Sequence, residues 1–446
     1  MRPLFLVLLP LLLPAASLAQ MLDIVSVVQR AVTERPTIIA SQAQGQAAAS
    51  AVREARSRYL PKINFSETFS MTNEPGGSLF IALNQERNVM SPGSGYDLVD
   101  PDTQQNFETR LTLEQTVYNA DTGYRIKEAN KRLESSQARS EWSRETAGFA
   151  AFQAYLGVQR ALADLQAVSS SEQEASELHR LAMERHDAGI GLKADQLRAQ
   201  VFRAEAERRA LTARNNLIIA QRRLALTIGQ AEGEVEISAP LDSSFFTPAI
   251  STVQAPERAD LQAFALEVES LDIAAERSRA AYLPRLDLSA SYGLYKESSP
   301  FGADGQAWRL GAAFNWELFD GFRRDANIAR VSAEKAAAAA QLNDVRREQA
   351  FRRAEVELRI QEARAQKESA AQSLTAALES QRLLQQRYES GLADLADLLA
   401  TQSALDQARS FLVATDIQLL FSLGQALLEE GRFVNTILTK SEVARE

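Results

Sequence analysis

The sequence predicts an α plus membrane-β protein made of two tandem repeats, each with one β-hairpin and long coiled-coil helices. Three observations predict this class. Proline and glycine are scarce, with 13 and 20 residues in a chain of 446, so turns are few and helices are long. Blocks of sequence recur along the chain. Four short segments also alternate apolar and polar residues with the period of a β-strand.

The first residues predict an export signal. Arg2 precedes an apolar run from Leu4 to Leu13, and the small residues Ser17 and Ala19 stand where a signal peptidase inspects the chain. We therefore expect residues 1–19 to be removed and the protein to be exported. No cysteine follows the signal, so no lipid anchor is expected there. No run of about 18 apolar residues occurs after residue 20, so no membrane-spanning helix is expected.

The composition argues against several functional classes. The chain has no cysteine and two histidines, which excludes thiolate metal sites and cysteine nucleophiles. His179 and His186 share one helix face, but without a third ligand we expect a solvated face, no metal site and no cofactor. A net charge of −9 is unfavourable for binding nucleic acid. An enzyme is not expected, because no nucleophile, base and oxyanion-stabilising group can be assembled.

The chain contains two copies of one structural unit. The segment Arg58 to Ile63 is echoed by Ala281 to Leu286, and Gly229 corresponds to Gly431. The domains expected from this repeat are a first repeat at 20–229, an irregular equatorial segment at 230–255, a second repeat at 256–431 and a C-terminal tail at 432–446.

Each repeat is expected to contain a helix, a β-hairpin, a very long helix, a tight turn and a shorter return helix. The expected positions are 36–59 and 257–281 for the separate helices, about 62–71, 106–118, 285–295 and 307–319 for the strands, about 124–188 and 324–390 for the long helices, and about 192–229 and 392–430 for the return helices. Each long helix would extend on the order of 100 Å. Its narrow apolar stripe is typical of a coiled coil. A return helix and a separate helix, stacked end to end, would match its length.

The strands decide between a soluble and a membrane protein. In the first strand Ile63, Phe65 and Phe69 alternate with polar residues, and the other three repeat the pattern. A tilted strand of about ten residues crosses the roughly 25 Å hydrocarbon layer with one face to lipid and one to water. Four strands cannot close a barrel, and lipid does not tolerate open edges, whereas three copies would supply twelve strands. A soluble β-sandwich, or a sheet that caps the helices, is the alternative.

One charged residue does not fit the expected lipid-facing row. Glu67 falls on the row of the first strand that would face lipid. We expect either a β-bulge that turns it inward or a position near the membrane interface, where the penalty is small.

Glycine turns join the long helices to the return helices. Gly189 and Gly191 stand at the first turn and Gly391 and Leu392 at the second, where a helix must stop and reverse. We expect these turns to form one end of the helical assembly.

The sequence resembles the TolC family of outer-membrane efflux proteins. The resemblance lies in the Tyr-Leu-Pro junctions at 59–61 and 282–284, the Arg-Ala-Asp-Leu segment at 258–261, residues 79–87 and the glycine turns, and it covers nearly all of 20–435. It implies a homotrimer with a twelve-stranded β-barrel in the outer membrane of a Gram-negative bacterium, in contact with its lipid, continued by a periplasmic α-helical barrel. It also implies a passive exit duct that works with a periplasmic adaptor and an inner-membrane pump of the RND or ABC type.

The resemblance assigns roles at the helix turns. Tyr388 and Asp397 match a tip tyrosine and an acid that narrows the closed end, and Asp195 matches the acid of the first turn. Ala393 replaces an arginine that latches the closed state in relatives, so we expect a weaker ionic latch. Ala400 replaces a second constricting acid.

Other residues at the turns complete the candidate site. Asp394 or Asp187 could compensate for the missing latch, and Gly189, Gly191, Gly391 and Leu392 are candidates for adaptor docking.

The acidic residues have two interpretations. Three Asp397 carboxylates in a narrow throat would attract cations and disfavour anions. Alternatively, Asp195 and Asp397 are helix N-terminal acids that interact with the helix macrodipole. For the whole protein, the alternative function is a periplasmic coiled-coil adaptor or scaffold without a membrane barrel.

Overall fold

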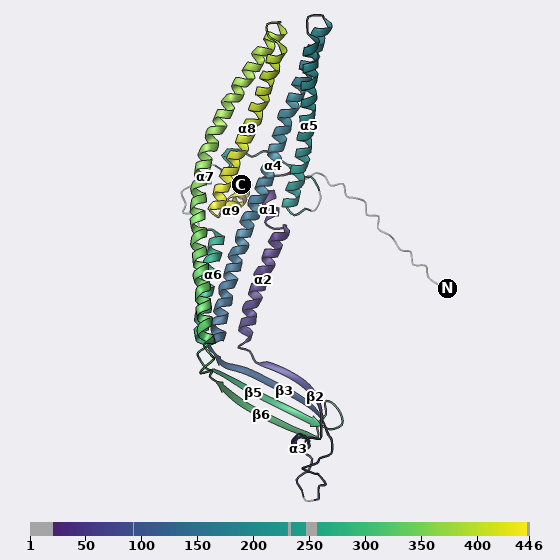
Figure 1. Ribbon diagram of the computed structural model, residues 1–446, viewed down its shortest axis with the longest axis vertical. Helices are drawn as coiled ribbons and strands as arrows, with labels where there is room; N and C mark the ends of the chain where they lie inside the picture. The colour runs from purple at the N-terminus through teal and green to yellow at the C-terminus, as the bar shows by residue number, and fades with distance from the viewer. Residues whose placement is uncertain (1–20, 92, 231–232, 247–256, 444–446) are drawn as a thin grey trace, which may run out of the picture. The chain divides into compact units, whose positions relative to one another are not determined.

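The computed structural model describes residues 21–91, 93–230, 233–246 and 257–443 (Figure 1). The expected signal peptide at 1–19 lies outside the described residues. The chain divides into two compact units, one made of Met1–Ala43, Ala138–Gln262 and Asp344–Glu446, the other of Gln44–Gln137 and Ala263–Asn343. Each unit takes parts from both repeats, so the structural division cuts across the repeats of the sequence.

The second unit contains a four-stranded antiparallel sheet of order β2-β3-β5-β6 (Figure 1). Its strands are β2 (Lys62–Thr72), β3 (Gln104–Asn119), β5 (Arg285–Lys296) and β6 (Gly305–Asn315). The pairing of β3 with β5 joins the hairpin of one repeat to that of the other. Among the described residues, β2 and β6 are the open edges of this sheet.

Two strands differ from the sequence prediction. β6 ends at Asn315 and not at 319, because Asn315 pairs with Arg285, the first residue of β5, and the chain beyond it has no partner strand. β3 has 16 residues, and its register against β5 shifts between Thr116 and Tyr118. The β-bulge adds one residue, and at the other end pairing with β2 extends the strand to Gln104, opposite Thr72.

The bulge expected at Glu67 is wrong. β2 pairs with β3 without a register shift, and Glu67 lies opposite Thr109. Glu67 therefore stays on the apolar row, where its carboxylate accepts a hydrogen bond of 2.5 Å from the Thr109 hydroxyl.

Alanine-rich sequence without internal proline forms the long helices α4 (Ala120–Asp187) and α7 (Arg323–Glu389) and the return helices α5 (Lys193–Thr227) and α8 (Leu395–Glu429). α8 begins at Leu395, three residues later than the sequence predicts. The reason is Asp394, which is the N-cap: its carboxylate accepts the N–H of Asp397 at 3.0 Å.

In both repeats the return helix meets the segment that leads into the separate helix, α2 (Pro36–Ser57) or α6 (Ala259–Ala280). Gly229 (φ +89°) and Gly431 (φ +68°) end the return helices. A Cβ on Gly229 would lie 3.0 Å from the Glu34 carbonyl oxygen, and one on Gly431 would lie 3.3 Å from Arg258 Cα. These close approaches require glycine.

The main hydrophobic core lies in the first unit. It packs α1 (Ile24–Ala31) and α9 (Phe433–Val443) against α4 and α8. Phe152 contacts Phe246 and Phe433 at ring-centroid distances of 5.7 and 5.3 Å, and all three are fully buried. The expected C-terminal tail therefore contains a helix, because Phe433 and Ile437 complete this core.

The equatorial segment is partly regular. Its described residues form β4 (Glu236–Ile237), which pairs in parallel with β1 (Met21–Leu22), and a short 3₁₀ turn η1 (Ser243–Phe246). The Gln159 side chain donates to the Leu241 carbonyl and accepts the Leu241 N–H, both at 2.8 Å. These bonds hold the segment to α4.

Among the described residues, one helix is long and apolar enough to cross a membrane by length and composition. It is α8, with a mean hydropathy of 1.6 over its most apolar window, although no continuous run of about 18 apolar residues occurs in it. Leu420, Leu423 and Leu427 of α8 lie in the core of the first unit, and this packing accounts for the apolar stretch.

Candidate functional site at the helix turns

The turn between α4 and α5 requires glycine at two positions. Gly189 has φ +74°. The N–H groups of Ile190 and Gly191 donate to the Arg185 carbonyl at 3.0 and 2.8 Å, closing the end of α4 as in a C-terminal helix cap. A Cβ on Gly191 would lie 2.9 Å from the His186 nitrogen. Any side chain at this position would therefore open the turn.

The turn between α7 and α8 has the same construction. Gly391 has φ +75°, and its N–H donates to the Tyr388 carbonyl at 3.0 Å. The Leu392 N–H donates to the Arg387 carbonyl at 2.8 Å. Leu392 and its counterpart Ile190 are 70 % and 71 % exposed. Each turn thus presents an apolar side chain beside a bare glycine backbone.

Arg185 of α4 joins the two helical hairpins. Its guanidinium group lies 4.9 Å from the ring centroid of Tyr388 on α7 and donates a hydrogen bond to the Tyr388 carbonyl. A cation over an aromatic face is stabilising, more so when desolvated. Tyr388 is buried, and burial raises the pKa of its hydroxyl.

Sequence reasoning did not single out Arg185 as a site residue. The available signal was the repeat itself, because Arg185 and Arg387 both stand four residues before a turn glycine. Ala393, at the position of the missing arginine, instead packs against the apolar cluster below. The cation that joins the two hairpins at the turns is therefore Arg185, from the other hairpin.

A small apolar cluster supports this contact. Its members come from α4, α5, α7 and α8: Leu178, Ala182, Ala199, Tyr388, Leu395 and Leu398. The cluster packs the ends of both hairpins together within the first unit.

The acidic candidates have different surroundings. Asp394 caps α8. Asp195 lies 3.5 Å from Arg198 one turn along α5. The Asp397 side chain is exposed and makes no ion pair with any part of the chain that the structure describes. The same holds for Asp187, which is also exposed. Asp397 lies in the first turn of α8, where its charge also suits the helix dipole, so both interpretations of this acid remain compatible with its position.

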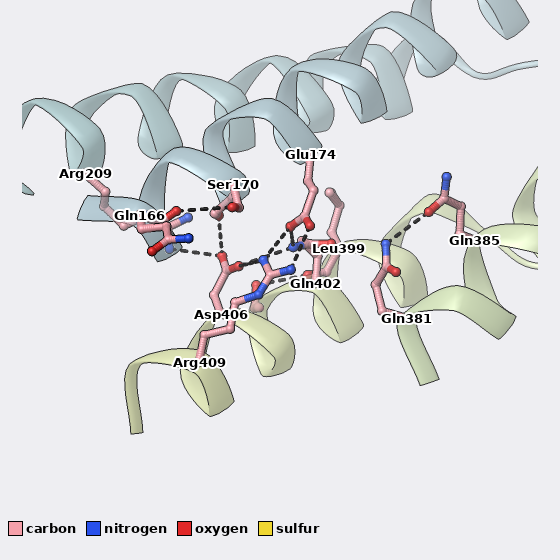
Figure 2. A network of polar contacts seen from close by, with 12 residues as sticks. Gln166, Ser170, Glu174, Arg209, Gln381, Gln385, Leu399, Gln402, Asp406 and Arg409 are labelled. Atoms are coloured by element: carbon pink, nitrogen blue, oxygen red, sulfur yellow. Dashed lines mark hydrogen bonds and ion pairs between the residues drawn. The ribbon is translucent and has the colours of Figure 1, made fainter. Parts of the chain in front are cut away.

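A polar network joins the hairpins farther along α4 and α8 (Figure 2). Arg409 donates to both carboxylate oxygens of Glu174, at 2.8 and 2.9 Å. Asp406 accepts from Ser171 at 2.7 Å and lies 3.4 Å from Arg209 of α5. Hydrogen bonding to Glu174 raises the pKa of Arg409 above its ordinary value, so the guanidinium group stays charged.

The network also contains a fully buried amide. Gln402 donates to Glu174 and, at 3.2 Å, to Asp406, while its Oε1 has no partner among the described residues. A buried acceptor without a partner costs free energy. The contact between hairpins at this level is therefore polar and incompletely satisfied.

No group of three potential metal ligands occurs in the described part of the chain. His179 and His186 are both partly exposed on α4.

The comparisons with known proteins agree with this architecture. The family model for outer membrane efflux proteins matches residues 27–230 and 254–423. No curated protein matches the sequence. Among solved structures, the outer membrane protein VceC of Vibrio cholerae has 18 % identity and a TM-score of 0.74, covering 93 % of this chain and 96 % of VceC.

Two further solved structures have the same fold. A membrane protein from Pseudomonas aeruginosa has 18 % identity and a TM-score of 0.77, covering 93 % of this chain and 91 % of its own. The open state of the Neisseria gonorrhoeae outer membrane channel MtrE has 13 % identity and a TM-score of 0.73, covering 92 % and 89 %. At such low identity these likenesses show the fold alone.

The family match covers most of the chain and both repeats, and its members are channel-type efflux proteins rather than enzymes. They lie in the outer membrane of Gram-negative bacteria and extend into the periplasm. The protein belongs to the outer membrane efflux protein family.

Proposed function

We propose that this protein is a homotrimeric exit duct, in which three four-stranded sheets close a twelve-stranded barrel in the outer membrane. The observation that carries the proposal is the sheet itself. Its two edges are open, and the apolar row exposes Phe65, Trp308 and Leu310 by 62 %, 78 % and 72 %. Edges must be paired and apolar faces covered in lipid. Strands of neighbouring copies would pair the edges, and lipid would cover the apolar face.

The opposite face of the sheet suits a water-filled bore. Register places Ser66, Arg110 and Gly293 in one cross-strand row, with Arg309 on the next strand. Polar residues facing inward are typical of outer-membrane barrels that conduct solutes. Substrates would therefore cross the membrane through the bore without a conformational step in the sheet.

The helix turns would form the periplasmic gate. Arg185 and Tyr388 at the turns, and Glu174 with Arg409 farther along, hold α7 and α8 against α4 and α5. Opening would separate the hairpins and break these contacts. Three Asp397 carboxylates, one from each subunit, would then give the throat its preference for cations.

The energy for transport would come from partners. We propose that a periplasmic adaptor docks on the turns at Gly189, Gly191, Gly391 and Leu392, where little side-chain bulk covers the backbone. An inner-membrane pump of the RND or ABC type would supply the substrate. The duct itself would remain passive.

Extraction and electrophysiology test the proposal. A barrel should require detergent for extraction and migrate as a trimer, whereas an adaptor or scaffold would leave membranes with a carbonate wash. In planar bilayers the purified trimer should conduct ions. Material that dissolves as a monomer in plain buffer, or a trimer that forms no pores, would contradict the exit-duct function.

A further inference from the structure

A cavity lined by arginines lies within the second unit, between α2, α4 and α6. Its volume is about 390 Å³, and its lining comprises Ala48, Ala51, Glu54, Ala55, Arg58, Arg125, Glu128, Ala129, Arg132 and Arg277. Four guanidinium groups and two carboxylates thus surround a space whose remaining wall is alanine.

The carboxylates near the cavity are shared among several arginines. Glu128 accepts from Arg277 at 2.5 Å and lies 2.6 Å from Arg132. Asp121, just outside the cavity, pairs with Arg125 and lies 3.6 Å from Arg277. Each of these acids therefore neutralises only part of the charge around it.

Arg58 has no ion pair or hydrogen bond within the described residues, and it is exposed. Glu54, one turn earlier on α2, does not reach it within ion-pair distance among the described contacts. An arginine fork without a carboxylate matches a phosphate group in geometry and charge.

The position of the cavity is set by the sheet in the same unit. Arg58 stands four residues before Lys62, the first residue of β2, and the intervening Tyr59 and Leu60 are 46 % and 63 % exposed. Exposed tyrosine and leucine at the end of a membrane strand are typical of the lipid interface. The arginines therefore lie just beyond the expected hydrocarbon layer.

The start of α4 lies beside Tyr59, next to the cavity. The Tyr59 hydroxyl lies 3.6 Å from the Cβ position of Gly123, in the first turn of α4, and Arg125 follows on the next turn. The N-terminus of a helix carries partial positive charge. The α4 residues that line the cavity begin at Arg125, beyond this first turn, so the positive charge of the cavity comes from its arginines.

We propose that this cavity binds the phosphate headgroup of an acidic glycerophospholipid from the inner leaflet of the outer membrane. Arg58 holds the phosphate, Arg125 and Arg132 contribute to the field, and the alanine wall accommodates the glycerol. The inference rests on the proposed immersion of the barrel, which places the cavity at the headgroup layer. Bound lipid would fix the junction between strands and helices in each subunit.

Native mass spectrometry of the purified trimer tests the site, with phosphatidylglycerol as the probe and phosphatidylcholine as the neutral comparison. Wild-type protein retains phosphatidylglycerol up to one molecule per subunit. Arg58→Gln lowers its retention about tenfold, as expected for losing a charge-assisted contact. The matched control Arg56→Gln removes the same charge two residues away, outside the cavity, and retains the lipid as wild type does. Glu54→Gln, which removes a lining carboxylate, raises retention.

Several outcomes would overturn the proposal. The first is that Arg58→Gln retains as much phosphatidylglycerol as the wild type. The second is that Arg56→Gln loses as much lipid as Arg58→Gln. The third is displacement of the lipid by millimolar inorganic phosphate, which would identify a free-anion site. Bilayer conductance is measured on the same preparations. If the variants conduct as trimers but lipid retention does not depend on Arg58, the lipid site alone fails. If wild-type protein does not conduct, the proposed function fails.

Discussion

The guanidinium group of Arg185 lies over the ring of Tyr388, 4.9 Å from its centroid, and donates to the backbone carbonyl of the same residue. Arg185 lies in the last turn of α4 and Tyr388 in the last turn of α7, so the contact joins the two hairpins within one chain. The Tyr388 hydroxyl takes no part in it. A link made to a ring face and a carbonyl responds to mutation differently from a link made to a hydroxyl.

The first prediction concerns this link. Arg185→Ala should raise the open probability of the channel in planar bilayers by about 5- to 30-fold, since an interaction of roughly 1–2 kcal/mol that holds the hairpins together is lost. Tyr388→Phe should leave the open probability near the wild-type value, because the ring face and carbonyl remain. Arg180→Ala is the matched control, since within the described part of the chain Arg180 pairs with Glu177 and Glu184 of its own helix alone. A large effect of Tyr388→Phe would show that the hydroxyl forms the link.

The second prediction separates two acids of the second turn. Asp397→Ala should raise single-channel conductance and weaken block by multivalent cations, because its exposed carboxylate would be repeated in three subunits. Asp394→Ala should instead cost about 1 kcal/mol of stability through loss of the α8 cap and leave cation block largely intact. Unchanged conductance and block in Asp397→Ala would exclude its role in the gate.

Periodicity and repetition could predict much of this fold. The strand starts at Lys62 and Arg285 were recognisable because Tyr-Leu-Pro precedes both and the hydrophobic period changes there. The end of β6 was not, because alternation continues through Trp316 while the partner strand has already begun at Arg285. Strand length depends on the partner, which a local pattern does not contain.

The candidate site was predictable only in part. The turn glycines follow from local helix-ending chemistry. The contact of Arg185 with Tyr388 joins residues more than 200 positions apart, so no local spacing could indicate it. Asp394 was read as a gate acid, although its position before the first turn of α8 already suggested an N-cap.

The third prediction concerns the network of Figure 2. Glu174→Gln and Arg409→Met should each lower the free energy of opening. The change in the double variant should be smaller than the sum of the two single changes, by a coupling energy of about 1–3 kcal/mol. The free energy of opening follows from open probabilities in bilayers. The control pair Glu379 and Arg382 is slightly closer, at 2.6 Å, but exposed and confined to α7. Additive effects of Glu174→Gln and Arg409→Met would show that the pair does not hold the hairpins.

The last prediction concerns the C-terminal helix. Glu145 of α4 is 2 % exposed and accepts the N–H of Val434, in the first turn of α9, at 3.1 Å. Burial raises the pKa of this carboxyl from 4.5 to about 6, against the opposing effect of the α9 amides and Arg144, and Glu141 on the same helix raises it further. The carboxylate therefore caps α9 at neutral pH at the cost of burying a charge.

A folded-state pKa above the unfolded value means that the folded chain binds the proton more tightly. The stability contributed by protonating Glu145 is thus absent above pH 6, appears as the pH falls through 6 and is complete near 4.5. It amounts to roughly 2 kcal/mol. Hydrogen exchange of the α9 amides should therefore slow, after correction for intrinsic rates, between pH 7.5 and 5. Glu145→Gln keeps the shape and an acceptor oxygen without the charge, so its corrected exchange should vary much less with pH. If Glu145→Gln shows the wild-type pH dependence, other carboxyls cause it, such as Glu141 on α4 or Glu430, which pairs with Arg432 just before α9.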